Sequence, residues 1–217
     1  MSFHVPKKNT AQYASIISRE LKKLYPRPKI ALNYGSPWEL LVAVILSAQC
    51  TDKKVNEVTK QLFQKYKSLK DYTNATPSEF QNYIWQTGFY RNKAKHILAS
   101  AEIVKKKYNG RVPRTMEQLL TLPGIARKSA NIVLSEAFGI IEGVPVDTHV
   151  IRLAKLYDLT KYTVPKKIEE DLMKLLPKDE WYKFSLRLIS YGREYCPAKR
   201  HDHAACPFVK ALKRNKK

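Results

Sequence analysis

Helical periodicity runs through nearly the whole chain of 217 residues. Between residues 10 and 24, apolar side chains from Tyr13 to Leu24 recur three and four positions apart, which places them on one face of a helix. Proline and glycine mark the ends of such segments, as Pro26 does here. Further helices are predicted over residues 37–49, 52–66, 77–87, 93–108, 115–122, 127–138, 148–157, 165–176 and 180–195. No stretch shows the alternation of a strand, so the sequence predicts an all-α fold of roughly ten helices.

Basic residues strongly outnumber acidic ones. The chain has 40 Lys and Arg against 19 Asp and Glu, a formal net charge of +21. Such an excess favours a polyanionic partner, most simply nucleic acid. The first residues lack the apolar run of a secretion signal, and the apolar run at 40–46 is too short to span a membrane. With three cysteines, an odd number, the sequence predicts a cytoplasmic protein located with the chromosome, neither secreted nor membrane-bound.

The stretch LPGIARKSANIVL, residues 122–134, combines a tight turn with the start of a helix. Backbone N–H groups at such a turn and at a helix N-terminus form an anion site, and Gly124 lets a phosphate approach closely. Arg127 and Lys128 stand at the positive end of that helix, where each cation is disfavoured by roughly 0.3–1 kcal/mol. A bound phosphate would compensate Arg127. On its own, a Pro-Gly turn is also common as simple punctuation between helices.

Two ionisable residues are candidates for catalysis. The helix dipole, neighbouring Arg127 and partial burial all disfavour the charged form of Lys128, and a neutral amine is a nucleophile. The alternative is a surface lysine that reaches for phosphate. Asp147 precedes the helix that begins at Thr148, where Asp is a preferred N-cap and its carboxylate is held ionised.

Five collinear segments make a resemblance recognisable. They are LVAVILSAQCTD (41–52), IWQTGFYRNKA (84–94), YNGRVPRT (108–115), LPGIARKSANIVLSEAFG with VPVDTHVIRL (122–153), and LISYGREYC (188–196). Together they resemble the endonuclease III family of helix-hairpin-helix DNA glycosylases. The resemblance implies a bifunctional base-excision repair DNA glycosylase and AP lyase, acting as a monomer on double-stranded DNA that contains oxidised pyrimidines or abasic sites. It makes Lys128 the residue that attacks C1′ and forms a Schiff base, and Asp147 the carboxylate that supports positive charge on the sugar.

The resemblance also assigns residues that hold distorted DNA. Gln49 would fill the space left by a flipped base, and Phe89 would wedge between bases of the other strand. The hairpin residues Leu122, Gly124, Ala126 and Arg127 would bind the DNA backbone, and Ala126 stands where the family usually has glycine. Ser47, Asp52 and His149 would line the lesion pocket. Four of these residues also have a purely structural alternative. Phe89 could pack in the core, Gln49 and Asp52 could cap helices, and His149 could lie on the surface.

The cysteines depart from the family pattern. Family members commonly bind a [4Fe–4S] cluster through C-x6-C-x2-C-x5-C. Here Cys196 and Cys206 fit two of those places, whereas His203 and Leu212 occupy the others, so no such cluster is expected. Zinc at Cys196, His201, His203 and Cys206 is the lesser alternative, since the spacing is unusual and cramped; a metal-free loop is favoured. The basic tail from Lys210 is expected to be frayed.

The resemblance implies two helical domains with a DNA-binding cleft between them. Residues 30–141 would form a six-helix domain with the hairpin, and residues 1–29 would join 142–217 in the second domain. An adenine or mismatch-specific monofunctional glycosylase is one alternative; Lys128 argues against it, as does the lack of an extra C-terminal domain. A non-catalytic helix-hairpin-helix protein is the other, and the presence of both Lys128 and Asp147 argues against that.

Overall fold

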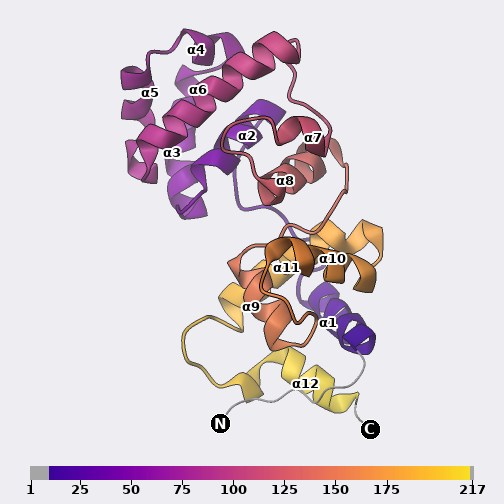
Figure 1. The fold of residues 1–217 in the computed structure, drawn as a ribbon. Coiled ribbons are helices and arrows are strands. Elements are labelled where there is room, and N and C mark those ends of the chain that lie inside the picture. Colours follow the sequence, from indigo (N-terminus) through magenta and orange to yellow (C-terminus); the bar gives the residue numbers. More distant parts are fainter. Residues whose placement is uncertain (1–9, 216–217) are drawn as a thin grey trace. The chain divides into compact units, whose positions relative to one another are not determined.

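The computed structural model describes residues 10–215, which divide into two compact units. We call Ala31–Glu142 the hairpin unit, and the described residues of 1–30 and 143–217 the terminal unit. The described range contains twelve α-helices and no strand, which confirms the all-α prediction (Figure 1). The predicted lack of a secretion signal concerns residues 1–10, of which 1–9 lie outside the described range. None of the described helices is both long and apolar enough to cross a membrane.

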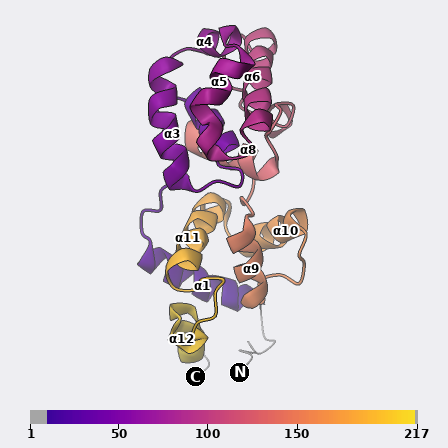
Figure 2. The same cartoon turned by 90° about the vertical axis from the view of Figure 1, so that its left-hand side faces the viewer.

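The hairpin unit is built around one almost wholly buried helix. That helix is α2 (Pro37–Leu46), with every residue from Leu40 to Leu46 buried. Around it stand α3 (Asp52–Lys65), α4 (Leu69–Asn74), α5 (Pro77–Ile84), a 3-10 turn (Trp85–Thr87), α6 (Tyr90–Lys107), α7 (Met116–Leu119) and α8 (Arg127–Phe138). Helices α3, α6 and α8 contact α2, and α5 lies between α3 and α6 (Figure 2). A helix enclosed by others is apolar on all sides, as the run at 40–46 is.

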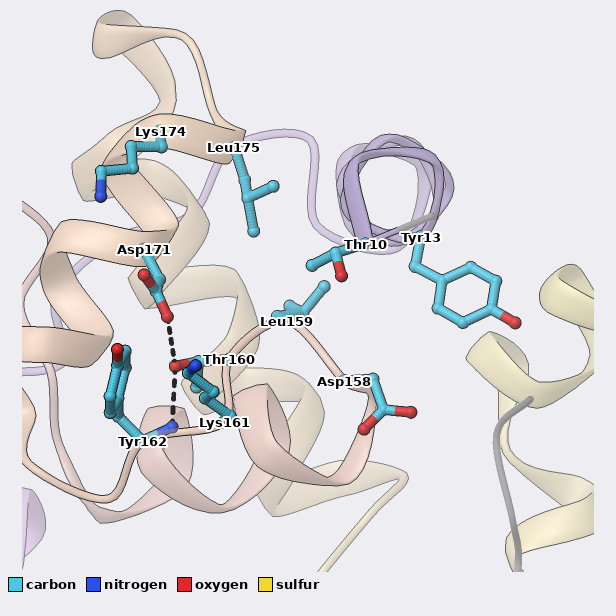
Figure 3. Close-up of a pocket in the computed structure, with 10 residues that line it drawn as sticks. All are labelled: Thr10, Tyr13, Asp158, Leu159, Thr160, Lys161, Tyr162, Asp171, Lys174 and Leu175. Atoms are coloured by element: carbon cyan, nitrogen blue, oxygen red, sulfur yellow. Dashed lines mark hydrogen bonds between the residues drawn. The ribbon is translucent and has the colours of Figure 1, made fainter. Parts of the chain in front are cut away.

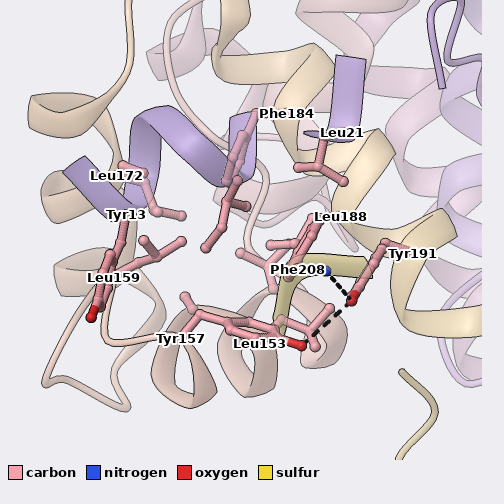
Figure 4. Packing of buried hydrophobic residues seen from close by; sticks show 14 of the residues in the cluster. Tyr13, Leu21, Leu153, Tyr157, Leu159, Leu172, Phe184, Leu188, Tyr191 and Phe208 are labelled. Carbon is pink, nitrogen blue, oxygen red and sulfur yellow. Dashed lines mark hydrogen bonds between the residues drawn. The ribbon is translucent and has the colours of Figure 1, made fainter. Parts of the chain in front are cut away.

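The terminal unit gathers both ends of the described chain around an aromatic core. It contains α1 (Thr10–Leu24), α9 (Thr148–Leu156), α10 (Pro165–Leu175), a 3-10 turn (Lys178–Glu180), α11 (Trp181–Glu194), a second 3-10 turn (His203–Ala205) and α12 (Pro207–Arg214). Helix α1 packs against α10, α11 and α12. In the core, the rings of Tyr191 and Phe208 stack with centroids 3.6 Å apart, and Tyr157 meets Phe208 edge-on (Figure 4).

Two helices were not predicted. Helix α4 is short and lies in a polar segment, where apolar periodicity is weak. Helix α12 corrects the expectation of a frayed tail: Phe208, Val209, Ala211 and Leu212 form a buried stripe on it, so its order continues to Arg214. A basic sequence can still fold when one face is apolar and finds a partner, here α1.

Candidate functional site

The predicted helix-hairpin-helix is formed by α7, a turn and α8. Thr115 caps α7 by accepting a hydrogen bond from the Gln118 N–H, and the Ile125 N–H donates to the Leu122 carbonyl across the turn. Leu122 and Ile125 are buried, at 2% and 7% exposure, and anchor the turn in the core. The Leu122 side chain therefore packs inside the unit, and its backbone N–H and carbonyl are hydrogen-bonded to Leu119 and Ile125.

Gly124 is required at the tip of the turn. Its φ of +81° lies in the left-handed region, and a Cβ there would lie 3.0 Å from Nδ1 of His96 on α6. Ser100, also on α6, donates from its hydroxyl to the Pro123 carbonyl at 3.1 Å. Helix α6 thus holds the turn by close packing and by a hydrogen bond.

The N-terminus of α8 has the features of an anion site. Ala126 is the N-cap residue, no side chain caps the helix, and the first turn carries no acidic residue. The N-cap side chain therefore occupies none of the leading N–H groups, which lie at the positive end of the helix. Ala126 has φ −104° and ψ 171°, a conformation that any L-residue adopts, so replacing glycine by alanine strains nothing in the backbone. Arg127 and Lys128 follow directly and are both half-buried.

Gln49 and Phe89 share an unusual backbone conformation. Both are non-glycine residues in the left-handed region, with φ +52° and +47°. Both are exposed, Phe89 at 64%, so the core-packing alternative for its ring does not apply. The predicted helix 37–49 ends at Leu46, and α6 begins at Tyr90, earlier than predicted, because these two residues turn the chain. Such strain persists only where the surroundings restrain it, and it is commonest at functional sites.

Lys93 supplies that restraint and was missed from the sequence. This α6 residue is only 4% exposed, and its Nζ donates to the carbonyls of Leu46 and Thr87, each at 2.8 Å. Those carbonyls end α2 and the 3-10 turn, directly before the loops of Gln49 and Phe89. Burial lowers the pKa of Lys93, and the charge of nearby Cys50 opposes that effect. Its place on the buried stripe of α6, four residues before Ile97, is the sequence signal that could have identified it.

The two predicted pocket residues of the hairpin unit flank the Gln49 loop. Ser47 is half-buried and donates from its hydroxyl to the Val44 carbonyl at the end of α2. Asp52 is the first residue of α3, while Thr51 provides the cap by accepting from the Lys54 N–H. Thr51, and not Asp52, is therefore the N-cap residue of α3. Asp52 is half-buried and lies next to the Gln49 loop in the chain.

Asp147 and His149 stand together in the first turn of α9, in the terminal unit. Asp147 caps the helix, its Oδ1 accepting from the Val150 N–H at 2.9 Å. The His149 ring is half-buried against α11, where a Cβ on Gly192 would lie 2.6 Å from its Nδ1. Within residues 10–215, that buried Nδ1 has no hydrogen-bond partner. Burial lowers the pKa of His149, Asp147 raises it, and Arg152 and Arg193 lower it further. His149 is thus seated in a slot made by Gly192 rather than on the surface.

The residues near the end of the chain do not suit a four-thiolate cluster. Cys196 and Cys206 lie together, but Leu212 is buried on α12 and the third cysteine, Cys50, belongs to the hairpin unit. His201 and His203 join Cys196 and Cys206, and one ligand atom from each of the four lies within 4.8 Å of the others. A [4Fe–4S] cluster held by four thiolates has no ligand set here.

A separate pocket lies in the terminal unit between α1 and the loop that follows α9. It is lined by Thr10, Tyr13, Asp158, Leu159, Thr160, Lys161, Tyr162, Asp171, Lys174 and Leu175 (Figure 3). The Thr160 hydroxyl donates to Asp171 at 2.7 Å and accepts from the Tyr162 N–H. None of the predicted site residues lines it.

Comparisons with known proteins agree with one family. Residues 42–178 match the model of the HhH-GPD superfamily base excision DNA repair proteins. Endonuclease III of Synechocystis sp. is 50% identical over 198 residues, which cover 91% of this chain and 90% of that protein. Endonuclease III of Escherichia coli is 34% identical over 91% of this chain and 93% of its own length. A solved non-covalent endonuclease III–DNA complex matches with a TM-score of 0.89 at 40% identity, covering 97% of this chain and 100% of that one. The chain therefore belongs to the endonuclease III family, the base excision repair DNA glycosylases with lyase activity.

Proposed function

We propose that this enzyme removes oxidised pyrimidines from double-stranded DNA and then cuts the strand, with Lys128 as the nucleophile. The observation that carries the proposal is the position of Lys128. It is half-buried in the first turn of α8, next to uncapped N–H groups that suit a DNA phosphate. A phosphate held there would bring the neighbouring sugar toward the amine, and an amine so placed can act as a nucleophile.

The proposed reaction has two stages. First, Nζ of Lys128 bonds to C1′ of the flipped nucleotide while the glycosidic bond breaks, and the departing base takes up a proton. As the C1′–O4′ bond breaks and the sugar ring opens, the amine gives up its two protons, one balancing the proton taken by the base and the other passing to O4′, and an imine forms. The imine then acidifies C2′; loss of that proton expels the 3′ phosphate by β-elimination and cuts the strand. Asp147, anchored by its cap to α9, would support positive charge on the sugar.

Gln49 and Phe89 are proposed to hold the opened duplex. Both are exposed on strained turns, so their side chains are presented outward at little cost in core packing. An apolar wedge costs a few kcal/mol of base unstacking, which contact with the bent duplex offsets. Ser47, Asp52 and His149 are proposed to line the lesion pocket. The net charge of +21 adds attraction for DNA along the whole chain. We propose that the enzyme acts as a monomer, where the chromosome lies.

Covalent trapping tests the proposal directly. Borohydride should reduce the imine and leave the protein attached to a duplex that contains thymine glycol. Lys128→Gln should abolish trapping, whereas Lys70→Gln, an exposed lysine on α4 of the same unit, should trap like the wild type. Trapping that survives Lys128→Gln would show that another amine is the nucleophile.

A panel of duplexes separates the alternatives. The proposal expects incision of thymine glycol and abasic-site duplexes and none of an A·8-oxoG duplex. Excision of adenine from A·8-oxoG without strand cleavage would instead identify a monofunctional adenine glycosylase. Binding of all the duplexes without any cleavage would identify a non-catalytic DNA-binding protein.

A further inference from the structure

Four side chains of the types that commonly bind metals lie close together in the loop between α11 and α12. The proposed reaction uses none of them. Cys196 and Cys206 lie at the two ends of this loop, with His201 and His203 between them. Both thiols are buried, at 0% and 2% exposure, and both histidines are half-buried. One ligand atom of each residue lies within 4.8 Å of the other three. Although the four residues are closely spaced in the sequence, the fold of the loop lets one ligand atom of each converge on a common point.

The four residues approach one another as two cysteine–histidine pairs. Nδ1 of His203 lies 3.8 Å from Sγ of Cys196, and Nε2 of His201 lies 3.5 Å from Sγ of Cys206. The two imidazole rings are 4.1 Å apart between centroids. In a tetrahedral zinc site with bonds of about 2.3 Å to sulfur and about 2.0–2.1 Å to nitrogen, neighbouring ligand atoms lie roughly 3.3–3.8 Å apart. The observed Sγ to nitrogen distances fall in that range.

The hydrogen bond made by His201 leaves the nitrogen that faces the cluster able to bind a cation. Nδ1 of His201 lies 2.9 Å from the Lys199 carbonyl, and a carbonyl oxygen only accepts, so Nδ1 carries the proton. In the neutral ring the lone pair is then on Nε2, which faces Cys206. Metal-binding histidines are typically oriented in this way, by donation from the second ring nitrogen to a carbonyl.

Groups behind the cluster hold Cys196 in place. Arg152 on α9 donates from Nη2 to the Cys196 carbonyl at 2.6 Å, and its Nη1 lies 3.8 Å from Sγ of Cys196. By contrast, residues 196–202 form neither helix nor strand, so this part of the loop depends on side chains for its shape.

We propose that Cys196, His201, His203 and Cys206 bind one zinc ion as a closed, structural Cys2His2 site. Two thiolates and two neutral imidazoles are ligands that zinc prefers, and the two thiolates balance its charge. A two-iron cluster with the same residues would spread them over two metal atoms, which the mutual 4.8 Å limit does not suit. The ion would join the end of α11 to the start of α12, and would order a loop whose Lys199 and Arg200 are exposed. Zinc would thus cross-link the segment where relatives in this family commonly use iron and sulfur.

The metal content of the full-length, untagged protein tests the proposal. Elemental analysis should find one zinc and no iron for each chain, and the purified protein should be colourless. Replacement by Co²⁺ should give the intense visible bands of a tetrahedral site with thiolate ligands. Less than a tenth of an equivalent of zinc after dialysis against zinc and desalting would overturn the proposal. Iron with acid-labile sulfide would overturn it as well, in favour of a cluster.

Variants and chelation locate the ion independently of activity. The double variant His201→Asn with His203→Asn should lose the zinc, whereas Cys50→Ser and His96→Asn, which alter a thiol and an imidazole of the hairpin unit, should keep it. Stripping zinc from the wild type should lower its Tm on the order of 5–10 °C, and added zinc should restore it. The double variant should not respond to the chelator. A full zinc equivalent in the double variant, or an unchanged wild-type Tm on complete zinc removal, would contradict the assignment.

Discussion

Each unit of this enzyme buries one cation, and the two are stabilised in different ways. In the terminal unit, Arg187 is 5% exposed and donates to the carboxylate of Glu180 and to the Tyr25 carbonyl. In the hairpin unit, Lys93 is 4% exposed and donates to the carbonyls of Leu46 and Thr87, with no carboxylate among its hydrogen-bond partners. The Arg187 charge is paired with a carboxylate, whereas the hydrogen-bond partners of the Lys93 ammonium are backbone carbonyls.

We infer from this difference that the Arg187 charge serves stability, whereas the Lys93 charge serves to position the two loops beside it. A compensated buried pair holds elements together, and removal of one partner leaves the other charge buried without its counter-charge. An uncompensated ammonium is costly to bury, and it persists here at the point where two strained, exposed loops begin. Lys93 joins the carbonyl that precedes the Gln49 loop to the one that precedes the Phe89 loop. The two side chains that we propose to distort DNA therefore share an anchor. Four substitutions or conditions test this contrast.

Arg187→Met should give the largest loss of stability. It leaves the Glu180 carboxylate buried with only Lys22, at 3.4 Å, as a charged partner. Removal of one member of a buried pair costs about 3–5 kcal/mol in the free energy of unfolding, measured here by urea titration. Adding Glu180→Gln to Arg187→Met should recover part of the loss. A loss below about 1 kcal/mol for Arg187→Met would mean that the pair does not hold the terminal unit.

Lys93→Met should affect DNA distortion more than stability. The variant relieves a buried charge but leaves two carbonyls without their donor, for a net loss of about 1–2 kcal/mol. Incision should fall roughly 10–100-fold, because small displacements of positioning groups are costly. Base flipping, read from a fluorescent base analogue opposite the lesion, should fall with it. Lys95→Met, an exposed neighbour on α6, is the control. Normal flipping by Lys93→Met would show that Lys93 only stabilises the unit.

The pH dependence of stability should report the uncompensated charge. Because burial lowers the pKa of Lys93 below its ordinary value of 10.5, the unfolded chain binds more protons between the two values. The free energy of unfolding of the wild type, relative to Lys93→Met, should therefore rise with pH up to about 10.5, by at most about 1.4 kcal/mol per pH unit. If the difference in unfolding free energy between wild type and Lys93→Met stays flat or falls as the pH rises, burial does not disfavour the Lys93 ammonium.

Substitutions at Phe89 should have the smallest effect on stability. Its ring is 64% exposed, so removing it forfeits little core packing. Phe89→Gly should be more stable than Phe89→Ala by about 1 kcal/mol, because glycine adopts φ +47° without strain. Both variants should lose incision several-fold through the missing wedge. Thermal unfolding and incision assays check the two expectations. Equal stability of the two variants would argue against backbone strain at this position.

Neighbouring residues in the sequence were enough to predict the helices and the hairpin. Apolar periodicity identified ten of the twelve helices, because each buries one stripe or, for α2, its whole surface. Pro123-Gly124 predicted the turn. The turn needs a left-handed backbone at Gly124, and glycine adopts that conformation without strain, so the sequence signal is local. Of the two readings of Phe89, a wedge or a core residue, its 64% exposure excludes the core residue.

Long-range packing decided what the local pattern could not. The partners of Lys93 include a carbonyl 47 residues away, Gly192 makes the slot for His149 from another helix, and α12 is ordered by its contact with α1. The gathering of two cysteines and two histidines also depends on how one irregular loop folds. The class of fold, the hairpin and the candidate nucleophile could thus be predicted from the sequence, since periodicity, turn chemistry and motif spacing reside in adjacent residues. Which charges are buried and which side chains converge could be seen only in the folded chain, because burial and hydrogen-bond partners come from residues distant in the sequence.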